Sequence, residues 1–164
     1  MSLRRGVRQC RIWLSNSRNI QENLALEEHL FRSQCFQDSD GLLIWRNEPA
    51  IVYGRFQNPY LESQVAVARR KGVELVRRFS GGGTVFHDLN NINFSVFTTH
   101  ARHHRLANMQ LLAEVLQKRW NVETHVNGRH DLLLHLFHLV EASKSLAHGV
   151  HHVLSSDVQP VQLC

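Results

Sequence analysis

Cysteine is scarce in this chain, and long apolar runs are lacking. The 164 residues include three cysteines, Cys10, Cys35 and Cys164, and no two of them have the Cys-x-x-Cys spacing. This distribution excludes a disulfide framework and a zinc ribbon, and it favours a reducing compartment. No apolar run approaches the roughly 18 residues that a membrane-spanning helix needs. We therefore predict no membrane partner.

Lysine is also rare. Of the 19 basic residues only three are lysine, Lys71, Lys118 and Lys144, and the formal net charge is +5. Arginine presents a planar fork that binds phosphate and carboxylate in a bidentate manner, so this balance suits an anionic ligand. A basic surface without a dedicated partner gives the same charge. Nucleic acid is not predicted as a partner, because the arginines are not interleaved with aromatic residues.

The N-terminal segment is rich in arginine and poor in acid. No Asp or Glu precedes Glu22, whereas five arginines do. Such a start is typical of a mitochondrial presequence, and equally of a basic first strand. We interpret residues 1–10 as the remnant of a leader and predict a mitochondrial location, with the cytoplasm as the alternative.

Three consecutive glycines, Gly81 to Gly83, follow Arg77 and Arg78. Glycine loses more backbone entropy on folding than any other residue, so a run of it indicates positive φ or close approach to the backbone. A glycine turn between two strands leaves N–H groups free to form an anion-binding nest. Neighbouring side chains on a strand point to opposite faces, so we expect only Arg78 to reach this turn. No Gly-Lys-Ser/Thr follows, which excludes a P-loop.

Hydrophobic periodicity predicts alternating strands and helices. Helical spacing appears around 24–31, capped by Asn16 or Ser17, and over 65–71 and 107–120. Turns are expected at 38–41, 90–91 and 127–128. Strands are predicted over 11–14, 42–45, 51–53, 74–79, 84–98, 122–126 and 131–134. The order predicts an α/β (α+β) fold with a mixed β-sheet flanked by helices.

Four motifs carry a resemblance to a known family. Residues 77–91, RRFSGGGTVFHDLNN, resemble the RRxSGGGxVxHDxGN signature of lipoate–protein ligase A and the lipoyltransferases. Residues 23–28, 45–59 and 127–132 resemble that family's first-helix, WRN…GRxQNP and GRxDL motifs in the same order. The match covers about residues 11–134, which would form the N-terminal part of a biotin/lipoate protein ligase-like catalytic domain.

The resemblance implies protein lipoylation. Such enzymes transfer a lipoyl or related acyl group from lipoyl-AMP to a lysine of 2-oxoacid dehydrogenase acceptor domains or of the glycine cleavage H protein. Ligase members make the adenylate from lipoate with ATP and Mg²⁺. The mixed anhydride supplies a leaving group, so the transfer needs mainly positioning and charge stabilisation. A biotin-type ligase, the related alternative, is expected to have a GRGRxGR-like nucleotide loop. The segment Gly54-Arg55-Phe56-Gln57 does not match that pattern.

The resemblance also predicts the site residues. Leu24 and Trp45 are expected to line the substrate pocket, and a core role for both is the stronger alternative. Asp88 is interpreted as a structural acid, and no metal ligands are predicted. The predicted adenylate-binding residues are Arg78, Ser80, Gly81, Gly82, Gly83, Thr84, Val85, Phe86, His87 and Arg129.

After Leu134 the chain departs from the family pattern. The KxSGxA-type segment, whose lysine contacts the acyl carbonyl and the phosphate, is absent, and Lys144 is the only lysine left. The catalytic residue is therefore unknown, with Lys144 as a weak candidate. We interpret residues 135–164 as a divergent tail and the catalytic domain as incomplete. The alternative function is an inactive product that only binds lipoyl-AMP or the acceptor.

Overall fold

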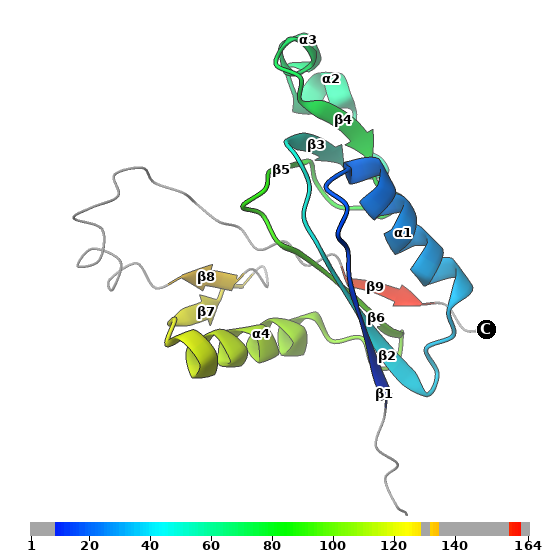
Figure 1. Ribbon diagram of the computed structural model, residues 1–164, viewed down its shortest axis with the longest axis vertical. Coiled ribbons are helices and arrows are strands. Elements are labelled where there is room, and N and C mark those ends of the chain that lie inside the picture. The colour runs from blue at the N-terminus through cyan, green and yellow to red at the C-terminus, as the bar shows by residue number, and fades with distance from the viewer. Residues whose placement is uncertain (1–8, 129–131, 135–157, 162–164) are drawn as a thin grey trace, which may run out of the picture. The chain divides into compact units, whose positions relative to one another are not determined.

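The computed structural model describes residues 9–128, 132–134 and 158–161. The chain forms two compact units, the first from Met1–His103 with Ser156–Cys164 and the second from His104–Ser155. Figure 1 labels the helices and strands of both units.

The first unit contains two small mixed sheets. Their strand orders are β1-β2-β6-β9 and β4-β3-β5. β1 is parallel to β2, β6 is antiparallel to β2, and β3 pairs parallel with β4 and antiparallel with β5. The elements in chain order are β1 (Gln9–Leu14), α1 (Ile20–Ser33), β2 (Ser39–Trp45), β3 (Ala50–Tyr53), α2 (Pro59–Glu62), α3 (Val65–Arg70), β4 (Glu74–Arg77), β5 (Val85–His87), β6 (Asn93–Thr99) and β9 (Val158–Val161). The predicted fold class, a mixed β-sheet flanked by helices, is confirmed.

Helix α1 begins at Asn19, whose side-chain oxygen accepts hydrogen bonds from the backbone N–H groups of Gln21 and Glu22. This cap satisfies two of the N–H groups that a helix start leaves without a partner. The predicted cap at Asn16 or Ser17 is therefore wrong. Ser17 instead supports the cap from outside, because its hydroxyl accepts from Asn19 N and donates to Glu22.

The core lies between α1 and one face of both sheets. Leu43 and Trp45 of β2 and Val52 of β3 are buried against Leu24 and Leu30 of α1. Alternate residues of β2 are buried, as expected for a strand with one covered face. The helix also buries two polar residues, Asn23 and Glu27, which an apolar stripe does not predict.

Contacts of the half-buried Arg102 override the turn that was predicted at residues 38–41. Strand β2 begins at Ser39. The guanidinium of Arg102 donates to the Asp40 carboxylate at 3.0 Å and to the carbonyl oxygens of Phe36, Gln37 and Ser39. These hydrogen bonds satisfy carbonyl oxygens at the start of the strand. Arg102 lies more than 60 residues further along the chain, so no local sequence pattern predicts the contact.

The remaining connections of this unit follow their turn chemistry. Gly72 has φ +68°, which confirms the predicted glycine stop after α3. The short helix α2 was not predicted; Asn58 caps it and Pro59 occupies its first turn. The predicted turn at Asn90–Asn91 is confirmed, and both backbone N–H groups donate to the Asp88 carboxylate.

The second unit contains α4 (Arg105–Trp120), β7 (Thr124–Val126) and β8 (Leu132–Leu134). His104 caps α4, and Asn121 ends it in the left-handed conformation with φ 53°. β7 and β8 pair antiparallel, with Val126 opposite Leu132, in agreement with the predicted turn after β7. Among the described residues no helix has the length and apolar character to cross a membrane.

Gly41 is tightly packed, because three aromatic side chains, Phe36, Trp13 and Phe97, lie against it. A Cβ there would lie 2.8 Å from both Phe36 Cε1 and Trp13 Cζ3. Phe36 and Phe97 stack at 5.5 Å between ring centroids, and Trp13 meets Phe97 edge-on. These rings have no free space into which to move.

We expect Gly41→Ala to lower the free energy of unfolding by about 1–3 kcal/mol, because overpacking forces ring and backbone shifts. Urea denaturation measures this change. Gly81→Ala is the matched control, since nothing lies within 4 Å of its added Cβ. Equal effects of the two substitutions would show that the aromatic packing at Gly41 is not tight.

Candidate active site

Arg77 is the last residue of β4 and Arg78 follows it directly, and the two side chains hold two different loops. The buried guanidinium of Arg78 reaches the glycine turn, as expected. Its Nη2 donates to Gly81 O at 2.8 Å and to Gly83 O at 2.9 Å, and its Nε donates to Gly81 O at 3.1 Å. Arg78 therefore fixes the turn from inside. Its predicted place beside an adenylate phosphate stays a prediction.

Arg77 points to the preceding loop instead. Its Nη1 lies 2.8–3.1 Å from the carbonyl oxygens of Gly54, Arg55 and Gln57. Arg55 N in turn donates to Ser80 O at 2.8 Å, which ties this loop to the glycine turn. A Cβ on Gly54 would lie 2.0 Å from Gly82 O, so only glycine permits the approach. The Gly54-Arg55 motif indicated this close approach, but neither residue was predicted for the site.

Within the glycine turn the three residues differ. Gly82 has φ +89°, which explains its glycine, whereas Gly81 and Gly83 have open space where a Cβ would stand. All three are exposed. In the part of the chain that the structure describes, their backbone N–H groups donate to no protein acceptor. Because these N–H groups have no acceptor among the described residues, they can donate to an anion.

Two hydroxyl groups flank this turn without partners. Ser80 Oγ and Thr84 Oγ1 are buried and make no hydrogen bond among the described residues. A buried hydroxyl without a partner costs free energy, and such groups in native structures point to a missing ligand or water. Phe86, on β5 directly after the turn, leaves 57% of its surface exposed. Free amides, orphan hydroxyls and an open aromatic ring together fit a nucleotide ester such as an acyl-adenylate.

His87 lies at the end of β5, buried against Trp45 and Asn47. Its Nδ1 is 3.3 Å from Asn47 Oδ1, and because Asn47 Nδ2 donates to Glu48 O, the Asn47 oxygen must be the acceptor. This contact therefore assigns the proton to Nδ1 and the lone pair to Nε2. Burial, together with the nearby Arg78 charge, lowers the pKa of His87 to about 4, although Asp88 opposes the shift. His87 is neutral at physiological pH.

The two predicted pocket residues, Leu24 and Trp45, are both buried in the core cluster. Trp45 packs edge-on against His87 at 5.7 Å between ring centroids. Its Nε1 donates to Ser95 Oγ at 3.1 Å, and Ser95 donates to the buried Glu27 carboxylate at 2.5 Å. Sequence reasoning missed this polar chain, because only the position of Glu27 in the first-helix motif signalled it. Lining of a substrate pocket stays a prediction.

Other predicted residues lie elsewhere. Val85 pairs with Val52 in the small sheet, beside the turn. Asp88 accepts from the two N–H groups of the Asn90–Asn91 turn, which agrees with a structural acid. Arg129 and Lys144 lie outside the described residues. In the described ranges no group of three or more His, Cys, Asp or Glu side chains could hold a metal ion.

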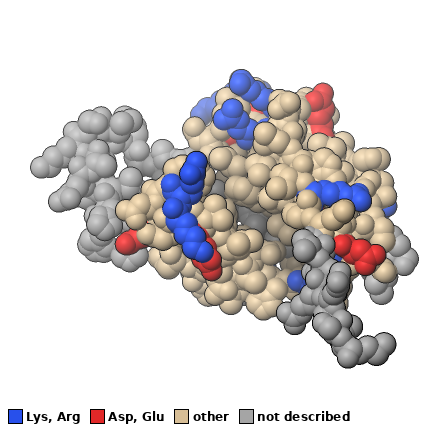
Figure 2. Space-filling model, turned by 60° about the horizontal axis from the view of Figure 1, so that its bottom comes forward, with Lys and Arg blue, Asp and Glu red and all other residues tan. Residues whose placement is uncertain are grey.

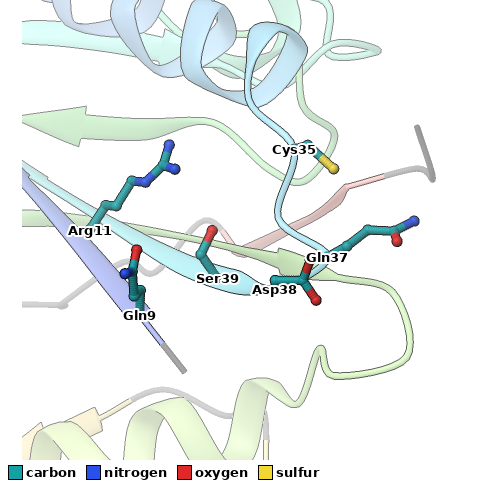
Figure 3. Close-up of a pocket in the computed structure, with 6 residues that line it drawn as sticks. All are labelled: Gln9, Arg11, Cys35, Gln37, Asp38 and Ser39. Atoms are coloured by element: carbon teal, nitrogen blue, oxygen red, sulfur yellow. The ribbon is translucent and has the colours of Figure 1, made fainter. Parts of the chain in front are cut away.

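A cavity of about 480 Å³ lies away from all these residues. It opens beside β1 and the segment between α1 and β2, and Figure 3 shows Arg11, Cys35 and Ser39 at its wall. None of the residues predicted for the site lines it. The glycine turn is exposed, and its N–H groups without acceptors among the described residues mark the candidate site.

The comparisons identify the family. Residues 19–152 match the model of the lipoyl protein ligase A/B catalytic domain, and the chain belongs to this family. The human mitochondrial lipoyl amidotransferase LIPT1 is 36% identical over 132 residues, which cover 80% of this chain and 35% of the human protein. The chain thus spans about a third of the length of the curated relatives it matches.

Solved structures agree with this assignment. Plasmodium falciparum LipL1 in complex with lipoate superposes with a TM-score of 0.68 at 28% identity, over 77% of this chain and 40% of LipL1. A lipoate-protein ligase A bound with ATP gives a TM-score of 0.61 at 26% identity, over 71% of this chain and 49% of the ligase.

The buried, neutral His87 makes folding sensitive to acid. Between pH 6.5 and pH 4 the unfolded chain binds a proton at this residue and the folded chain does not, so protonation favours unfolding. Above pH 6.5 the residue is neutral in both states and has no effect. We expect the free energy of unfolding to fall by about 2 kcal/mol from pH 7 to pH 5 through His87 alone.

Urea unfolding of wild type and His87→Gln at both pH values isolates this contribution, since all other groups titrate in both proteins. The stability advantage of wild type over the variant should shrink at pH 5. A constant difference at the two pH values would contradict a buried neutral His87.

Proposed function

We propose that this chain binds lipoyl-AMP on the glycine turn and serves protein lipoylation. The observation that carries the proposal is the pairing of Arg78 with the carbonyl oxygens of Gly81 and Gly83. The pairing fixes an exposed turn whose three consecutive backbone N–H groups donate to no acceptor among the described residues, so a phosphate or a developing oxyanion could accept from them. Family membership supports the same ligand class.

The reaction is an acyl transfer. The amine nitrogen of an acceptor lysine attacks the lipoyl carbonyl carbon and forms an amide bond. The bond from that carbon to the phosphate oxygen breaks, AMP leaves with the electron pair, and the amine releases a proton to solvent. The turn amides would stabilise the negative charge that develops during this step. The adenylate is supplied preformed, or in ligase members it is made from lipoate, ATP and Mg²⁺.

The neighbouring residues take complementary roles in this proposal. The hydroxyl groups of Ser80 and Thr84 would donate hydrogen bonds to the phosphate or the ribose. Phe86 would pack against the adenine, because aromatic faces stack on bases. His87 would present its unprotonated Nε2 as an acceptor, held by Asn47, and Leu24 with Trp45 would border the acyl chain. Arg129 would lie across the adenylate.

Acceptor domains of 2-oxoacid dehydrogenases and the glycine cleavage H protein are the proposed partners. The mitochondrion is the proposed location, supported by the Arg-rich N-terminus and by the similarity to human LIPT1. The catalytic residue remains Lys144 or a group that replaces the KxSGxA lysine. Because that segment is absent from the sequence, a second candidate function is binding of lipoyl-AMP or the acceptor without transfer.

Gly82→Ala tests the site directly. Isothermal titration with lipoyl-AMP should show binding to wild type and a loss of about 10-fold or more in the variant, because the added Cβ strains φ +89° and lies 2.8 Å from Arg78 Nη2. Gly72→Ala is the matched control. It also strains a positive φ, but nothing lies within 4 Å of its Cβ.

Retention of lipoyl-AMP binding by Gly82→Ala would overturn the glycine-turn site, and so would an equal loss in Gly72→Ala. A gel-shift assay on an unmodified acceptor domain then separates the two candidate functions. Transfer supports the enzyme, whereas binding of lipoyl-AMP without transfer supports the binding-only product.

A further inference from the structure

The short arm formed by residues 54–62, between β3 and the end of α2, exposes large apolar side chains. Phe56, Tyr60 and Leu61 leave 84%, 78% and 83% of their surfaces uncovered. A single exposed apolar residue is ordinary. Three within six positions, two of them aromatic, are typical of binding surfaces. We refer to these three residues together with Arg55 as the arm surface.

The arm is held firmly although its side chains are exposed. Arg77 donates to three carbonyl oxygens of residues 54–57, and Asn58 caps the helix that carries Tyr60 and Leu61. Tyr53 and Ser63 close its far end with a 2.6 Å hydrogen bond between their hydroxyl groups. A rigid backbone lowers the entropy cost of binding, because the exposed groups are already placed.

Basic side chains lie in the arm and at the end of the neighbouring helix α3. The guanidinium carbon of Arg55 lies 5.5 Å from the Phe56 ring centroid, and the exposed Arg69, Arg70 and Lys71 end the next helix, α3. Figure 2 shows Lys and Arg side chains gathered over the end of the unit where α3 lies. Glu62 is an acid at the end of the arm, and Gln57, with its amide nitrogen assigned to that side, donates to its carboxylate. The complementary partner surface is acidic with an apolar centre.

The arm is continuous with the glycine turn. Arg55 N donates to Ser80 O, and the Gly54 backbone packs directly against Gly82. A partner on the arm surface would therefore stand beside the residues proposed to hold the acyl-adenylate. A lysine carried by that partner would need only a short reach to the acyl group.

We propose that the arm surface is a docking site for the lipoyl acceptor domain, and that it recognises an acidic, partly apolar face next to the target lysine. This inference rests on the proposed function for the identity of the partner. It adds a recognition surface made of Arg55, Phe56, Tyr60 and Leu61, which bind the acceptor and not the adenylate.

The test measures two affinities for each protein by isothermal titration. One ligand is lipoyl-AMP, and the other is an unmodified acceptor domain of a 2-oxoacid dehydrogenase with acidic residues beside its lysine. The variant is Phe56→Ser combined with Leu61→Ser, and the control is Leu14→Ser, which removes a comparably exposed side chain, 70% uncovered, from β1. These changes touch exposed groups, and circular dichroism checks that each protein stays folded.

We expect the double variant to bind the acceptor at least about 10-fold more weakly than wild type, with unchanged affinity for lipoyl-AMP. Leu14→Ser should match wild type for both ligands. Acceptor binding by wild type should weaken as salt rises, and weaken again in Arg69→Glu with Arg70→Glu, because the contact is partly electrostatic.

Undiminished acceptor binding by the double variant would overturn the proposal, as would an equal loss in Leu14→Ser. Stronger binding of a DNA or RNA oligonucleotide than of the acceptor domain would also overturn it. The two proposals fail separately. Binding of lipoyl-AMP without binding of the acceptor rejects the docking site alone, whereas binding of the acceptor without binding of lipoyl-AMP rejects the adenylate site alone.

Discussion

The buried guanidinium of Arg78 is the contact on which the candidate site depends. A run of three glycines has no side chains with which to define its own shape and carries a large entropy cost of ordering. Arg78 supplies the missing constraint by binding the carbonyl oxygens of Gly81 and Gly83, and Gly54 packs closely enough to confine Gly82 from the other side. A charged side chain thereby fixes the backbone of the turn.

The support for this turn extends into the rest of the first unit. Arg77 at the end of β4 and Arg78 directly after it hold the arm and the glycine turn, so the end of this strand places the two loops together. Behind them, the chain of hydrogen bonds from Glu27 through Ser95 to Trp45 fixes the indole that packs against His87. Buried polar groups with satisfied partners favour one arrangement over others, which suits a site whose geometry must be preformed.

The sequence predicted those features that local chemistry determines. The glycine turn, the stop at Gly72, the turn at Asn90–Asn91 and the mixed sheet follow from turn residues and periodicity, and the site residues were gathered by motif. Features that depend on distant partners were not predictable. Arg102 donates to Asp40 at the start of β2 although the two are far apart in the sequence, and the buried Glu27 accepts a hydrogen bond from the distant Ser95. Pattern reasoning assigned both segments to more ordinary structures, a turn and a purely apolar helix face.

The central claim is that the amides of Gly81, Gly82 and Gly83 bind the anionic part of an acyl-adenylate. Nuclear magnetic resonance of ¹⁵N-labelled protein, titrated with lipoyl-AMP, tests it most directly. The account predicts downfield shifts of these three amide protons on saturation, because each gains a charged acceptor, while the Gly72 amide keeps its position. Saturation of the protein with no movement of these three signals would place the ligand elsewhere and contradict the account.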